Sequence, residues 1–205
     1  MFKTFDVNSV SATTSSAVKI EHGESYPAQI LGLWNASKTY NDVTKNGMGL
    51  LIAVADENGK VIYRSLFMSL DGYVLGAKAN YAKIMGGLLR VSDTDEALQR
   101  KIREAGLGDL SALVGRPCLA RMIVKERGDK SWATIDTIAG ETSRSKGLSL
   151  NAATLEPIDI RKVFGKFIEI SDLADCVHMD GLRVTDPLAK VDDGMENVVR
   201  DDTVF

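Results

Sequence analysis

Two groups of residues in this sequence combine an aromatic ring with nearby cations. The groups are Trp34 with Lys38, Tyr40 and Lys45, and Trp132 with Lys125 and Lys130. Bases stack on flat aromatic faces and cations neutralise phosphates, so the combination suits single-stranded nucleic acid. Such binding needs no fixed motif, only the right side chains on one surface. Either tryptophan alone could be a core residue, and their joint occurrence beside cations favours the binding interpretation.

Further basic residues extend this candidate surface. They are expected on the outward faces of predicted strands, where they would neutralise a phosphate backbone: Arg64, Arg121, Lys125 and Arg127. Each of these side chains taken singly is equally typical of an ordinary solvated surface. Their value as candidates depends on the strand register, which the hairpin turns must set.

Residues for enzymatic or metal chemistry are sparse. His22 and His178 are the only histidines, and neither lies in a nucleophile motif. The sequence contains no phosphate-binding GxxxxGK[ST] motif. Cys118 and Cys176 form no CxxC pair, and Cys176-Val-His178 is half of a metal site without a second half. We therefore expect no enzymatic activity, no metal and no cofactor.

The final segment, residues 186–205, is acidic and ends on Phe205. Its six acidic and two basic residues give it a charge of −4, so residues 1–185 carry +1 of the total of −3. Such a segment is expected to be flexible and solvated. The tail could serve solubility alone, or it could compete with phosphates for basic residues and dock a partner. The candidate partner-binding residues are Asp192, Asp193, Asp201, Asp202 and Phe205.

Length and composition place the chain among ordinary globular proteins. It has 205 residues, of which 44% are hydrophobic, enough for one domain with appendages. No apolar run approaches the roughly 20 residues of a membrane span. Residues 1–22 are rich in Ser and Thr, lack the apolar stretch of a signal peptide, and predict a flexible arm in a cytoplasmic protein.

Three strands are predicted in the first part of the chain, over residues 26–34, 48–55 and 61–68. Gly32 marks a candidate bulge in the first strand, and residues 35–47 are expected to form a polar loop. Asn58-Gly59 is a strong hairpin signal. A two-residue turn there places Val54 opposite Tyr63 and Ala53 opposite Arg64. One face of the hairpin is then a core face and the other carries Arg64 outward. The core face is expected to hold Leu50, Ile52, Val54, Val61, Tyr63 and Phe67.

Helical spacing replaces the strand pattern after residue 80. Tyr81, Ile84, Met85 and Leu88 share one helical face, although Gly86-Gly87 weakens this helix. A second helix is expected after a capping box at Asp93, ending near Gly106, with a further helical turn at 109–114.

Two more strands are predicted at residues 117–127 and 132–139, joined by a turn at 128–130. An even-numbered loop places Lys125 opposite Trp132 and Arg121 opposite Asp136. Three strands, a helical insertion and two strands are the order of an OB-fold, a five-stranded barrel. We therefore predict a mainly β protein with an OB-fold domain over residues 23–185, including a C-terminal extension from 148 that packs on the barrel.

The strand order over residues 24–140 and the ending Asp201-Asp202-Thr203-Val204-Phe205 resemble single-stranded-DNA-binding proteins of tailed bacteriophages. The stretch LGDLSALVGRPCLARMIV from Leu107 also resembles a pattern of these proteins, a Leu-Val-Gly before a strand. Arg200 and Val204 depart from the usual tail. The resemblance implies coating of replication intermediates in an infected bacterial host and contact of the tail with a replicative polymerase or helicase.

The sequence thus predicts binding and protection of single-stranded DNA, largely without sequence specificity, during phage replication or recombination. The alternative is an OB-fold or barrel module that binds protein, as a replication accessory factor or virion component, without touching DNA. The sequence leaves open the oligomeric state, a homodimer included, and the choice between DNA and RNA.

Overall fold

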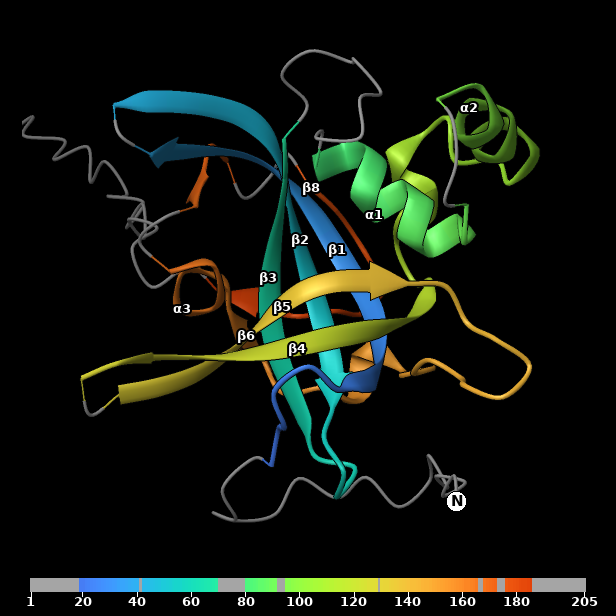
Figure 1. Cartoon of the computed structure of the whole chain (residues 1–205). Helices are drawn as coiled ribbons and strands as arrows, with labels where there is room; N and C mark the ends of the chain where they lie inside the picture. The colour runs from blue at the N-terminus through green and yellow to red at the C-terminus, as the bar shows by residue number, and fades with distance from the viewer. Residues whose placement is uncertain are drawn as a thin grey trace, which may run out of the picture.

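The computed structural model describes residues 19–40, 42–69, 80–91, 95–128, 130–165, 168–172 and 176–185. Its architecture is mainly β, as the sequence predicts (Figure 1). Five long strands dominate it: β1 (Ser25–Tyr40), β2 (Val43–Ala55), β3 (Val61–Ser69), β4 (Pro117–Arg127) and β5 (Lys130–Ala139). The N-terminal arm and the acidic tail expected from the sequence lie largely outside the described residues.

The five long strands form one antiparallel sheet in the order β3-β2-β1-β4-β5. Its two end strands are β3 and β5, and no paired ladder joins them in the part of the chain described here. Two short strands, β7 (Glu169–Ile170) and β8 (Cys176–His178), also pair with β1. The strand β1 therefore has β2 along one edge, and along the other edge β4, β8 and β7 in turn.

The predicted bulge in the first strand is confirmed. The pairing of β1 with β2 shifts between Ile30 and Gly32, which leaves Leu31 as the extra residue. A Cβ atom at position 32 would lie 2.7 Å from the Trp34 ring and 2.9 Å from His178. Glycine at 32 thus permits the close approach of Trp34 and β8 to the strand.

The turn between β2 and β3 differs from the prediction by one residue. Val54 pairs with Ile62 and Ala53 with Tyr63, because the connection has three residues, 57–59, instead of two. The buried Asp56 accepts hydrogen bonds from the backbone nitrogens of Asn58 and Lys60, at 2.8 and 2.9 Å. Gly59 takes the left-handed conformation, with φ of 76°, that such a three-residue turn requires.

This one-residue shift exchanges the two faces of β3 relative to β2. Tyr63 consequently joins the Leu51 and Ala53 side of the sheet, and Arg64 lies on the Leu50 and Ile52 side.

Helices follow β3, as predicted. The first two are α1 (Asn80–Leu89) and α2 (Asp95–Glu104), and a 3₁₀ turn spans Leu110–Leu113. Helix α1 continues through Gly86-Gly87 to Leu89. A Cβ atom at 87 would collide with the carbonyl oxygen of Ile138, so glycine at this position lets the helix lie against β5. Gly106, with φ of 69°, ends α2 as expected. The capping box at Asp93 falls outside the described residues.

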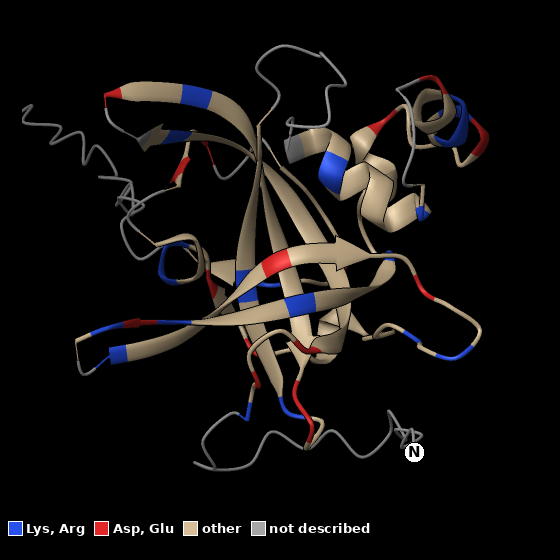
Figure 2. Ribbon diagram, viewed as in Figure 1, with Lys and Arg blue, Asp and Glu red and all other residues tan. Residues whose placement is uncertain are grey.

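The pairing of β4 with β5 is confirmed near the turn. Lys125 lies opposite Trp132 and Arg127 opposite Lys130, in a hairpin whose cations Figure 2 shows in blue. A bulge after Arg121 moves its partner from the expected Asp136 to Thr137. Asp136 still lies beside Arg121, with 4.0 Å between Oδ2 and Nη1.

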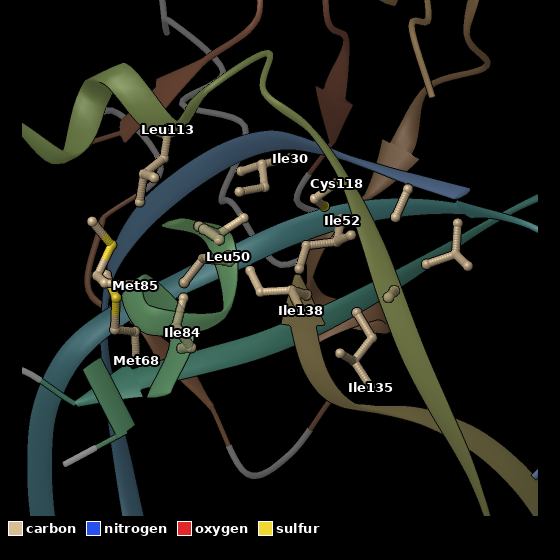
Figure 3. Close-up of a cluster of buried hydrophobic side chains, with 14 of the residues drawn as sticks. Ile30, Leu50, Ile52, Met68, Ile84, Met85, Leu113, Cys118, Ile135 and Ile138 are labelled. Carbon is tan, nitrogen blue, oxygen red and sulfur yellow. The ribbon is translucent and has the colours of Figure 1, made fainter. Parts of the chain in front are cut away.

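Two hydrophobic cores lie on opposite faces of β1 and β2. The first fills the space between the sheet, α1 and the curled strands β4 and β5, with Ile30, Ile52 and Met85 among its members (Figure 3). The second contains Leu31, Leu51 and Ala53, and the C-terminal segment covers it. The sequence predicts that this segment packs on the barrel, and the structure shows it packing on the sheet of β1 and β2.

The C-terminal segment consists of short elements. These are a 3₁₀ turn (Ala152–Thr154), β6 (Ile158–Asp159), α3 (Ile160–Phe164), β7, β8 and β9 (Val184–Thr185). β6 and β9 pair in parallel as a separate two-stranded sheet. The apolar and basic stretch at 160–170 begins as the short helix α3 and ends in β7.

Candidate nucleic-acid interface

The predicted loop at 35–47 is instead a hairpin arm. Strand β1 continues to Tyr40 and β2 starts at Val43, so Lys38 pairs directly with Lys45 across the hairpin. The arm is stiffened near its tip by a 2.9 Å hydrogen bond between the hydroxyls of Thr39 and Thr44. The polar composition of residues 35–47 predicts a loop, but the structure pairs most of these residues regularly as strands.

The turn between β4 and β5 forms a second arm. Lys125, Arg127 and Lys130 are all exposed on it, and Trp132 is 45% exposed. Both arms extend past the sheet on the same side of the molecule, at the left of the view (Figure 1). The Trp132 and Lys125 juxtaposition predicted from the sequence is therefore present on the second arm.

Each arm places two cations directly opposite one another. The pairs are Lys38 with Lys45 and Arg127 with Lys130. Like charges at directly opposed positions destabilise an antiparallel hairpin. A bound polyanion removes this repulsion, so both arms are electrostatically suited to a phosphate backbone.

Trp34 is not a stacking platform, contrary to the expectation. Its side chain is fully buried, and its ring lies 6.2 Å from the His178 ring in a stacked arrangement. Phe164 contacts it edge-on at 6.0 Å. The C-terminal segment supplies both partners, and no local pattern in the sequence predicts that it covers this position. Trp34 is accordingly a residue of the second core.

Arg64 is not on the outer surface either. Its half-buried guanidinium donates to the carbonyl of Ala133 on β5 through Nε and to that of Tyr63 through Nη1, both at 2.8 Å. Burial lowers the pKa of Arg64 below its ordinary value. The side chain bridges the unpaired end strands β3 and β5, so it fastens the second arm to the sheet at the residue after Trp132.

Arg121 is exposed, as predicted, but it lies away from the tips of the arms. Its guanidinium donates to the carbonyl of Gly23 at 3.2 Å and lies beside Asp136. These contacts tie Arg121 to the start of β1 and partly neutralise its charge. It is therefore a weaker candidate for phosphate contact than the cations of the two arms.

Acidic residues also lie near the arms. Asp42 is at the turn of the first arm, Glu126 is on the second, and the exposed Glu169 on β7 pairs through its backbone with Ser37. The cations are thus grouped in pairs and do not form a uniform basic surface. The side chain of Tyr40, and the tail residues Asp192, Asp193, Asp201, Asp202 and Phe205, lie outside what the structure describes.

One basic element near the arms was not among the expected site residues. The helix α3 carries Arg161 and Lys162, and Figure 2 shows it in blue between the two arms. The alternation of apolar and basic residues in IRKVF is the sequence signal for it, since it predicts an element with one buried and one exposed side.

No family model, curated protein or solved structure matches the chain. No helix among the described residues is long and apolar enough to cross a membrane. Within the same residues, no group of three or more His, Cys, Asp and Glu side chains is placed to hold a metal ion.

Proposed function

We propose that this protein binds single-stranded DNA, largely without sequence specificity, across the surface that spans its two arms. The observation that carries the proposal is the pairing of Lys125 with the exposed Trp132 on an arm that also holds Arg127 and Lys130. The other arm adds Lys38 and Lys45 on the same side of the molecule (Figure 2). Phosphates would contact the cations, and a base would stack on Trp132.

The strand order supports assignment to the OB-fold. Strands β1 to β3 form a meander, helices lie between β3 and β4, and β1 pairs with both β2 and β4. In an OB-fold the connections between the first two and the last two strands flank the binding face. The two arms occupy those connections here. Arg64 provides the link between β3 and β5 that a closed barrel makes by strand pairing.

The resemblance to phage single-stranded-DNA-binding proteins supports the same proposal. On this view the protein coats DNA during phage replication or recombination. Its acidic tail competes with DNA for the arm cations and contacts replication partners. Deletion of residues 186–205 is then expected to raise affinity for single strands, most strongly at low salt, where electrostatic competition is greatest. Equal or weaker binding by the truncated protein would contradict this competition.

The direct test uses fluorescence anisotropy to measure the binding of a labelled oligothymidylate and of a matched duplex at several salt concentrations. An oligonucleotide of ~20 nucleotides exceeds the roughly 4–16 nucleotides that one OB-fold covers. If the four paired arm cations each contact a phosphate, the logarithm of the association constant should fall with a slope of about 3 against the logarithm of salt concentration. An absence of salt-dependent binding to the single strand would reject the proposal in favour of a protein-binding module.

A further inference from the structure

The outer face of strands β1 to β3 is covered by the protein's own C-terminal segment. Leu31, Leu51 and Ala53 of this face are fully buried, and they pack with Leu148, Ile160 and Leu182 in the second core. The backbone of β8 pairs with Gly32, Leu33 and Trp34. This face is therefore closed to any external ligand while the segment is in place.

In the OB-fold, that same face and its flanking loops are the usual binding surface for oligonucleotides. On the function proposed above, other residues must therefore take the place of the covered face. A strand passing from one arm to the other must cross the outside of the C-terminal segment, because β1 to β3 are no longer accessible between the arms.

The helix α3 is a part of the segment that lies between the arms in the view of Figure 1. Phe164 anchors it, because its ring packs where a Cβ atom on Gly49 would lie. The hydroxyl of Ser65 on β3 donates to the carbonyl of Val163 at 3.1 Å. The Asp159 carboxylate accepts from the backbone nitrogen of Lys162 at 2.9 Å and so caps the helix.

These contacts fix α3 through its backbone and its apolar face, and they leave the Lys162 side chain exposed. A cation held on a rigid element contacts phosphate with less loss of side-chain and loop freedom than one on a mobile loop. Lys162 therefore lies at an exposed, well-anchored position between the cation pairs of the two arms.

We propose that the C-terminal segment forms the floor of the single-stranded-DNA site, with Lys162 on α3 contacting the phosphate backbone between the two arms. The segment then has two roles, since it closes the second core on its inner side and binds DNA on its outer side. The arms contribute cation pairs and a stacking ring, and α3 contributes the contact that connects them.

The test compares Lys162→Glu with Lys83→Glu in the full chain. Lys83 is an exposed lysine on α1, which lies on the other side of the sheet from the arms in Figure 1. Both changes alter the net charge equally, so long-range electrostatics affect the two variants alike. Binding of the labelled oligothymidylate is measured at several salt concentrations, and thermal unfolding verifies that each variant folds.

We expect Lys162→Glu to weaken binding roughly three- to tenfold more than Lys83→Glu at low salt. The neutral variant Lys162→Gln should lower the salt slope by about 0.7, the value for one phosphate contact to a single strand. Equal binding by the two charge-reversal variants, with the unmodified protein still binding, would overturn the role of α3 alone. Failure of the unmodified protein to bind would instead overturn the proposed function, and this role with it.

Discussion

Substitution of Trp132 by alanine tests the stacking role most directly. The side chain is 45% exposed, so its removal opens no sealed cavity, and an exposed change of this kind alters stability by about 0.5 kcal/mol or little more. Stacking of a base on an aromatic ring is worth ~1–3 kcal/mol. At about 1.4 kcal/mol for each factor of ten, Trp132→Ala should weaken single-strand binding roughly 5- to 140-fold.

The assay can use the two tryptophans as separate reporters. Trp34 is fully buried, so DNA or iodide should quench chiefly the fluorescence of Trp132. Titration with unlabelled oligothymidylate should quench the emission of the unmodified protein, and Trp132→Ala should lose that response. Anisotropy with a labelled oligonucleotide gives the change in affinity independently.

A matched control is available on β8. Val177 is also 45% exposed, but it carries neither a charge nor an aromatic ring, and it lies on β8, away from the arms and from α3, the element of the C-terminal segment proposed to contact DNA. Val177→Ala should leave affinity and unfolding temperature close to those of the unmodified protein. Unchanged affinity in Trp132→Ala, or an equal loss in Val177→Ala, would refute the reasoning that Trp132 is a stacking platform.

Three further substitutions or reagents test the structure itself. Trp34→Ala should lower the free energy of unfolding by ~3–5 kcal/mol, as for other large core aromatics, and denaturant titration would show no such loss if Trp34 lay outside the core. Arg64→Met should cost about 1–3 kcal/mol, because the part-buried hydrogen bond from its charged guanidinium to the Ala133 carbonyl is lost. It should also raise iodide quenching of Trp132, and unchanged quenching would argue against a role for Arg64 in placing the arm. Burial raises the pKa of the Cys118 thiol to about 12 from an ordinary 9.0, so its contribution to stability should be complete below pH 9 and decline as the pH rises toward 12. Iodoacetamide at pH 8 should accordingly modify the half-buried Cys176 before Cys118, and mass spectrometry showing the reverse order would contradict the burial of Cys118.

Local patterns predicted the second arm well. Strands β4 and β5 alternate clearly, and a short turn between them leaves few possible registers, so Lys125 opposite Trp132 follows from the sequence. The bulge at Asp136 could not be predicted from the sequence, because it changes the strand pairing without changing the alternation of side chains in β4.

One local side-chain cap and one set of long-range contacts account for the wrong predictions. The register of β2 and β3 depends on the Asp56 carboxylate, which caps a three-residue turn around Asn58-Gly59. This register turns Arg64 toward β5. The burial of Trp34 depends on Phe164 and His178, which lie far away in the sequence. Neither dependence leaves a mark in the local hydrophobic pattern.

The shared use of β1 by β4, β8 and β7 constrains how this chain can fold. Strand β1 is synthesised early, and its last partners are synthesised late, so many non-local contacts must form before the second core closes. Such topologies fold slowly, and they expose apolar strands in the meantime. A nascent or shortened chain that lacks the segment from Leu148 onward presents Leu31, Leu51 and Tyr63 on an uncovered sheet, and we expect it to be prone to aggregation.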